Sequence, residues 1–212
     1  MNNPIKIDLT CGNSNVASCG ITDDLIRNLS LWQTNHQAVS DEALTELYHT
    51  LCPVTESQKQ TVALADLLYK KQDYRVAFHL YMGALSSNPL STLLLKKAYN
   101  CTFLGAFNKE YGAELLCKLS RLNTIIAASG SGNTAQDPIR VAQTTDAYQY
   151  LFNVVHAKDV ATHKQIHLAG DISLDELLIS VNGEKEPRLF HYSCPFETEQ
   201  DRNEFLIKKK GF

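Results

Sequence analysis

Apolar residues recur with the 3.6-residue period of amphipathic helices along one continuous stretch, from Gln58 to Ile126. Three interruptions divide the stretch: Lys71-Gln72-Asp73, Asn88-Pro89 and Gly105. Because glycine takes the left-handed backbone conformation at little cost, we expect Gly105 to end the third helix in that conformation. Four helices joined by such short connections should pack as antiparallel neighbours.

The segment before this stretch is polar and irregular over residues 1–38, apart from a short helix expected over Asp23–Trp32. Ser40 provides an N-cap hydroxyl for a further helix, and the acids that follow it favour the positive end of a helix dipole. We expect this helix to run to about Leu51, because Pro53 disfavours the helical conformation of the residue before it.

The helical pattern ends at Ser129-Gly130-Ser131-Gly132-Asn133, where we place a boundary. Beyond it, Asn182-Gly183 is a strong hairpin signal, because both residues tolerate positive φ. Expected strands cover 139–141, 164–168, 174–181 and 188–193, and expected helices cover 146–155, with Tyr148, Leu151, Phe152 and Val155 facing inward, and 198–207. The sequence therefore predicts an α+β chain in three parts: an irregular segment over 1–38, a helical part over 39–128, and a small antiparallel sheet with one or two helices over 129–212, packed on the helical part.

The composition of the chain limits which functions, as well as which folds, are expected. Apolar residues make up 44% of the chain and charged residues 20%, which is enough to bury a core. The net charge is −3 and neither half is basic, so nucleic acid, whose phosphates require clustered Lys and Arg, is not an expected partner. No apolar run approaches the ~20 residues of a membrane span. The N-terminus shows no secretory leader, which predicts a cytoplasmic protein.

The six cysteines contain no C-x-x-C pair, so a structural zinc site is not expected, and we expect no cofactor. Cys101 and Cys117 fall on apolar helical faces, where small buried side chains are typical. A bridge between Cys11 and Cys19 would require an oxidising compartment.

Residues Tyr74–Pro89 resemble the second half of a tetratricopeptide repeat. That repeat requires a large residue, Ala, an aromatic residue, Ala and Pro in order, and the matching residues here are Tyr74, Ala77, Tyr81, Ala84 and Pro89. The next period does not match, since Tyr111, Leu115 and Lys118 occupy the Ala, aromatic and Ala positions. The resemblance implies one repeat with degenerate neighbours. Because a single helix pair cannot bury its own face, we expect the sheet part to cap it.

Over roughly residues 40–205 the chain resembles a bacterial family known only as a domain of unknown function, in which a helical, repeat-like part precedes a small mixed part. The residues that carry this resemblance are Ile125-Ile126, Ser129-Gly130-Ser131-Gly132, Val141, Asp146, Tyr148, Asp171 and Phe190-His191-Tyr192. The chain departs from the family pattern at Ser131, where Asp is usual, and at Ala147, which separates the acid from Tyr148. The resemblance implies a fold and no activity. Many relatives carry leaders, so export or a periplasmic location is the alternative to the cytoplasm.

Three groups of residues have a possible chemical role. The glycine-rich segment 129–134 lacks the preceding strand, the following helix and the Lys of a phosphate-binding loop, and is better explained as a turn that ends a helix. His163, His167 and Asp171 recur at four-residue intervals, a spacing and a donor set that would suit zinc or iron in a small hydrolase or metal-dependent enzyme. His191 and Cys194 would lie on opposite faces of a regular strand, which disfavours a catalytic pair.

Aromatic residues gather in the helical part, and two explanations remain open for them. Core packing accounts for such residues in most helical proteins. A groove for a peptide is the functional alternative, and the candidate surface residues are Tyr74, Phe78, Tyr81 and Tyr99, with Tyr69 nearby. We therefore expect a non-enzymatic module that binds a protein or peptide. The metal-dependent enzyme is one alternative, and a small ligand bound between the two halves is another.

Overall fold

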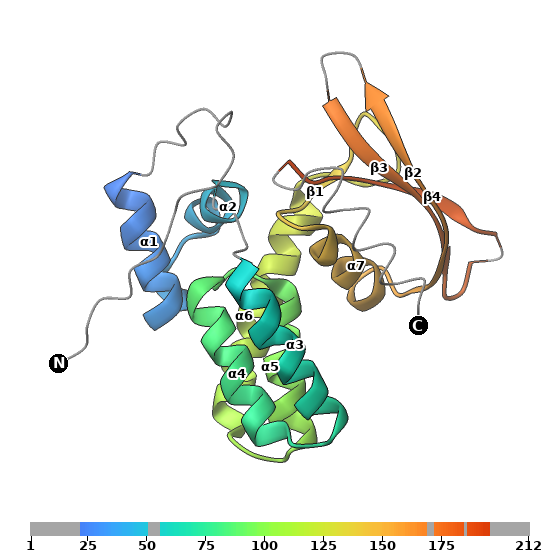
Figure 1. Cartoon of the computed structure of the whole chain (residues 1–212). Coiled ribbons are helices and arrows are strands. Elements are labelled where there is room, and N and C mark those ends of the chain that lie inside the picture. Colours follow the sequence, from blue (N-terminus) through green and yellow to red (C-terminus); the bar gives the residue numbers. More distant parts are fainter. Residues whose placement is uncertain (1–21, 51–55, 169–171, 185, 196–212) are drawn as a thin grey trace. The chain divides into compact units, whose positions relative to one another are not determined.

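The computed structural model describes residues 22–50, 56–168, 172–184 and 186–195 (Figure 1). It confirms the α+β fold class, because helices occupy the first part of the chain and a small sheet the last part. Two compact units are present, Met1–Leu116 and Cys117–Phe212. The division lies inside helix α6 (Lys109–Ala128), whereas the predicted boundary at Ser129 follows the end of this helix. The expected helix over 198–207 and the pair Cys11 and Cys19 lie outside the described residues.

The first unit, which we call the helical unit, consists of helices with short connections. Their bounds are α1 (Asp23–Thr34), the 3₁₀ helix η1 (His36–Ala38), α2 (Asp41–Thr50), α3 (Glu56–Lys70), α4 (Tyr74–Ser87), α5 (Thr92–Leu104) and the first part of α6. Side chains cap the starts of four helices by accepting a backbone N–H: Thr22, Ser40, Asp73 and Ser91. Across the part of the chain that the structure describes, none of the helices has the length and hydropathy needed to cross a bilayer.

Helix α1 is attached to the unit through Trp32, which is almost fully buried. The Trp32 indole donates a 2.9 Å hydrogen bond to the Pro89 carbonyl oxygen, and the Gln33 amide donates one of 3.2 Å to Ser86. Pro89 lies in the α4–α5 connection, and Ser86 lies in the last turn of α4. A buried indole finds a hydrogen-bond partner here, as buried Trp usually does.

Gly105 is the C-cap of α5, as predicted, but the left-handed conformation expected for it is wrong. Gly105 has a φ of −80°, and the left-handed residues are instead Ala106 and Asn108, with φ of 51° and 50°. Gly105 serves close packing, because a Cβ there would lie 2.6 Å from the Phe107 ring and 2.9 Å from the Cys101 carbonyl oxygen. The absence of a side chain, more than a special φ, is what this position requires.

The second unit, which we call the sheet unit, contains β1 (Ile139–Arg140), α7 (Thr144–Asn153), β2 (Ala157–Leu168), β3 (Ile172–Val181) and β4 (Arg188–Ser193) after the end of α6. The strand order is β1-β4-β3-β2. Strands β2, β3 and β4 pair antiparallel, as predicted, but β1 pairs parallel with β4, so the sheet is mixed. The β2–β3 ladder has two register shifts, near Lys158 and Ala161.

Helix α7 packs on the sheet face that carries Leu177, Phe190 and Tyr192. The rings of Tyr150 and Phe190 stack at 6.4 Å, and Tyr148 lies within electrostatic range of Asp175 on the same face. Alternation along β3 and β4 produces this face, since Leu177 pairs with Phe190 across the two strands.

Two predicted orientations are wrong. Phe152 was expected to face inward but is 40% exposed, because the buried stripe of α7 follows Tyr148 and Leu151, and the next residue lies about 100° further around the helix. Cys117 is exposed rather than buried, since it lies between Leu115 and Leu119 on the opposite side of α6. The hairpin at Asn182-Gly183 is confirmed, with Gly183 at a φ of +90°.

Two glycine substitutions should change stability in opposite directions. Gly132 has a φ of +69°, and its Cβ would lie 2.6 Å from the Phe190 ring, so Gly132→Ala should destabilise the sheet unit by about 2 kcal/mol or more. Gly83 lies exposed inside α4 with open space at its Cβ position, so Gly83→Ala should stabilise the helical unit by roughly 0.5–1 kcal/mol. Urea denaturation followed by circular dichroism measures both effects. Unchanged stability in Gly132→Ala would contradict the close contact with Phe190.

Candidate functional site

Two connections of the helical unit, the α3–α4 turn (71–73) and the α5–α6 loop (105–108), lie at the same end of that unit (Figure 1). Aromatic residues surround them, and we call this region the aromatic end. Its aromatic members are Tyr69, Tyr74, Phe78, Tyr99, Phe103, Phe107 and Tyr111. They come from four helices and one loop, and ring contacts there join positions as far apart in the sequence as Phe78 and Tyr111.

A chain of ring contacts holds the two connections together. Phe107 of the α5–α6 loop contacts Phe78 of α4, with ring centroids 5.5 Å apart, and Phe78 contacts Tyr111 of α6 at 6.0 Å. Both pairs are edge-to-face, which is the arrangement that the ring quadrupoles favour. The Arg75 guanidinium lies 5.6 Å from the Phe107 ring centroid, a cation–π distance.

A second set of aromatic groups faces solvent on α5. Phe103 is 69% exposed, more than any other large apolar residue in the described part of the chain, and the adjacent Leu104 is 49% exposed. The Phe103 ring stacks on Tyr99, one helical turn earlier, at 6.2 Å and an interplanar angle of 25°. The Lys96 ammonium lies 5.6 Å from the Tyr99 ring. These four side chains form an ordered apolar surface with a cation at one end.

The backbone at the aromatic end is unusual. Within the described residues, four residues other than glycine have a left-handed φ, and three of them lie here: Gln72, Ala106 and Asn108. Alanine rarely adopts this conformation, because its Cβ approaches the carbonyl oxygen. Such conformations are stable only where the surrounding contacts hold the backbone in place, and they are more frequent at functional sites than elsewhere. The ring contacts of Phe107 supply those surrounding contacts.

The structure separates the four predicted surface residues into two pairs. Phe78 and Tyr81 are buried, with exposures of 6% and 1%, so both pack inside the helical unit. Tyr74 and Tyr99 are half-buried, and both lie at the aromatic end. Residues 103 and 104 were not among the predicted candidates. Their signal in the sequence is a pair of adjacent large apolar residues, Phe103-Leu104, directly after Cys101 and Thr102, which are the buried residues near the end of α5.

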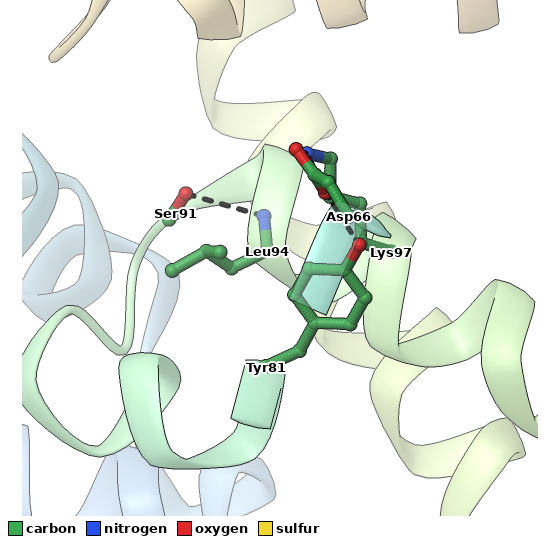
Figure 2. Close-up of polar contacts among 5 residues, drawn as sticks. All are labelled: Asp66, Tyr81, Ser91, Leu94 and Lys97. Atoms are coloured by element: carbon green, nitrogen blue, oxygen red, sulfur yellow. Dashed lines mark hydrogen bonds and ion pairs between the residues drawn. The ribbon is translucent and has the colours of Figure 1, made fainter. Parts of the chain in front are cut away.

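A single carboxylate joins three helices of the same unit, as Figure 2 shows. The Tyr81 hydroxyl of α4 donates a 2.5 Å hydrogen bond to Asp66 of α3, and Lys97 of α5 binds both carboxylate oxygens at 2.6 and 2.8 Å. Burial, reinforced by the Asp66 carboxylate, raises the pKa of Tyr81, so its hydroxyl remains a donor. Burial likewise raises the pKa of the Cys101 thiol to about 11, which makes it unreactive at neutral pH.

The sheet unit contains a row of ionisable side chains across three strands. Lys164 of β2 lies 2.6 Å from one oxygen of Glu176 in β3, and Nε2 of His191 in β4 lies 3.0 Å from the other. Nδ1 of His191 lies 3.3 Å from the Gly132 carbonyl oxygen. Both ring nitrogens therefore face an oxygen atom, one of a backbone carbonyl and one of a carboxylate. The hydrogen bond from Lys164 is the largest influence on the Glu176 carboxyl and lowers its pKa.

The opposite face of the sheet carries a buried carboxylate. Asp175 has no exposed surface and stands across the strands from Tyr192, which is also fully buried. Burial, with the nearby Asp175 carboxylate, raises the pKa of Tyr148 to about 12 and raises the pKa of Tyr192 as well. Both phenols therefore remain neutral at physiological pH. Asp146 of α7, which belongs to the family-like pattern, is also buried.

Other predicted residues fall in different places. His167 is exposed on β2, His163 lies on the same strand, and Asp171 is outside the described residues. Among the side chains that the structure describes, no three His, Cys, Asp or Glu residues are arranged to hold a metal ion, and the predicted metal site stays a prediction. His191 and Cys194 are both buried but have different partners, since the Cys194 thiol donates to the Ala142 carbonyl oxygen at 3.4 Å.

The segment 129–134 forms a turn that closes the end of the sheet. The Ser129 hydroxyl donates to Ile126 at the end of α6 and accepts the Arg140 N–H at 2.8 Å. Gly132 takes the left-handed conformation, and its carbonyl oxygen accepts the His191 N–H at 2.7 Å. The Ser131 N–H is bound by the Asp137 carboxylate at 3.0 Å. These contacts give the family-like motif, residues 129–132, a structural role: it forms a turn.

Comparison of this chain with models of protein families, with curated sequences and with solved structures finds no match. Function must therefore be argued from geometry. The aromatic end combines exposed apolar groups, ordered rings, cations and a constrained backbone, and we take it as the candidate functional site.

Removing one hydroxyl tests the Asp66 cluster. Tyr81→Phe keeps the buried ring and should destabilise the helical unit by about 1–2 kcal/mol, because the carboxylate loses a charge-assisted hydrogen bond. Tyr99→Phe is the matched control and should change the unfolding free energy by less than about 0.5 kcal/mol, since Tyr99 is only half-buried. Chemical denaturation measures both. Equal effects of the two substitutions would show that the Tyr81 hydroxyl does not join the helices.

The row across the sheet predicts a pH dependence. A carboxyl whose pKa is lower in the folded state stabilises the fold above its unfolded pKa, ordinarily 4.5 for Glu, and loses that contribution as the pH falls through the folded value. The difference in unfolding free energy between the unmodified protein and Glu176→Gln should be full near neutral pH and shrink below about pH 4.5. Urea titrations at a series of pH values measure it, with the exposed Glu186→Gln as control. A difference that grows on acidification would refute the assignment.

Proposed function

We propose that this protein is a non-enzymatic interaction module and that the aromatic end of its helical unit is the surface that contacts a protein partner. The observation that carries the proposal is the exposure of Phe103, 69%, beside Leu104 at 49%. Single exposed apolar side chains are common on protein surfaces. Adjacent large apolar side chains that also stack on another ring, as Phe103 stacks on Tyr99, are typical of contact surfaces.

The composition of the site supports a protein contact. Aromatic residues and Arg are enriched at the centres of protein interfaces, where they bury a large area with little loss of conformational freedom. Here Phe103 and Tyr99 are already stacked, and Phe107 is held by Phe78 and Arg75. Rings that are ordered before binding lose little entropy on association.

The resemblance to a tetratricopeptide repeat supports the same proposal. Ala77, Tyr81 and Ala84 are buried along α4, where the small residues allow close approach of the helices. Helical repeats commonly present surfaces to protein partners. The likeness to a bacterial family of unknown function adds an expected architecture and no further activity.

The proposal is tested by comparing two exposed apolar positions of the helical unit. Phe103→Ser should abolish capture of a specific partner, because the anchor of the surface is removed, whereas Ile26→Ser, at a residue 53% exposed on α1, should leave capture unchanged. Affinity capture from the native source followed by mass spectrometry gives the comparison, and circular dichroism confirms that both variants are folded. A partner retained equally by both variants binds elsewhere and overturns the proposal.

A further inference from the structure

We infer that the aromatic end binds an acidic peptide segment that presents a large apolar side chain. This inference rests on the proposed function and names the chemistry of its partner. The exposed apolar residues of the site indicate a ligand with a large apolar side chain, and its positive charge indicates an acidic ligand.

The apolar anchor lies at the C-terminal end of α5. Phe103 and Leu104 are adjacent in sequence and both are about half exposed or more, so together they offer an apolar patch that water covers in the free protein. A partner that covers the patch must bring apolar surface of its own, since burial of the ring against a polar group would gain little. The stacked Tyr99 ring extends the patch along α5.

Cations outnumber acids around this patch. The basic residues at the aromatic end are Lys70, Lys71, Arg75, Lys96 and Lys109, and the acidic residues are Asp73, Glu110 and Glu114. The Asp73 carboxylate accepts the Val76 N–H as the N-cap of α4, next to the positive end of that helix dipole. Lys97 is not counted, because Asp66 neutralises it.

This excess of positive charge is local. The chain as a whole has a net charge of −3, and α1 and α2 have the opposite balance. Arg27 is the one Lys or Arg of α1 and α2, against five acids: Asp23, Asp24, Asp41, Glu42 and Glu46. A partner guided by charge is therefore directed to the aromatic end when it is acidic and to α1 and α2 when it is basic.

The backbone of the site is already constrained. Ala106 and Asn108 hold left-handed conformations beside Phe107, whose ring is packed between Phe78 and Arg75. A surface formed by such a loop does not need to reorganise when a ligand arrives. Short extended or helical peptides can therefore be tested as ligands without the rest of a partner protein.

The test is selection of a displayed random 12-residue peptide library on the full chain, with binding of the enriched peptides measured by fluorescence anisotropy. We expect enriched peptides to carry net negative charge and at least one Phe, Trp, Leu or Tyr. Phe103→Ser should weaken their binding by about tenfold or more. The charge reversal Lys70→Glu/Lys71→Glu should weaken it by a similar factor at low salt, and raising the salt from about 50 to 500 mM should weaken binding to the unmodified protein.

Lys158→Glu, a charge reversal at an exposed position of the sheet unit, is the control and should leave binding unchanged. Enriched peptides that depend on Phe103 but are neutral or basic would overturn the inference and leave the proposed function standing. If no enriched peptide depends on Phe103, the inference and the proposed contact surface both fail. Circular dichroism of each variant separates loss of binding from loss of folding.

Discussion

The Asp66 carboxylate is the one polar group that touches three helices of the helical unit, α3, α4 and α5, among those described. Its oxygens are shared between a buried phenol and an ammonium group, so a displacement of any one helix breaks a charge-assisted hydrogen bond. The Asp66 side chain is 39% exposed, so solvent weakens the ion pair, and the apolar core contributes most of the stability. The carboxylate instead defines the relative positions of the helices. The aromatic end depends on those positions, because its rings come from all of them.

The helices of this protein could be predicted because their signal is local. The 3.6-residue period, Ser40, Asn88-Pro89 and the turn 71–73 identify each element from its own residues, and the structure places helices there. The Asp66–Lys97 pair could not be predicted, since its members are separated by 31 positions and each is an ordinary surface residue in the sequence. Gly105 shows the same limit of prediction from local sequence. A glycine is compatible with a left-handed cap and with close packing, and only the position of the Phe107 ring in the structure shows that close packing is its role here.

The candidate site was predicted only in part, for a similar reason. An apolar residue on a helical stripe is buried or exposed according to which neighbours exist, and one helix cannot reveal its neighbours. Tyr81 and Tyr99 both lie on helices of the helical unit, yet one is buried against Asp66 and the other lies beside the exposed Phe103. In the sheet unit, the row of Lys164, Glu176 and His191 depends on the register of three strands, which residue type alone does not determine.

Strand β2 ends the order of the described sheet, and its irregular ladder has a consequence for behaviour at high concentration. A long, regular outer strand presents a continuous series of backbone donors and acceptors to which a second molecule can add. The two shifts near Lys158 and Ala161 interrupt that series, and the same strand carries Lys158, Asp159 and Lys164. Intermolecular strand addition would therefore lack a matching register over the first part of β2, before Thr162. Irregularities of this kind in an outer strand are one way in which proteins oppose edge-to-edge aggregation.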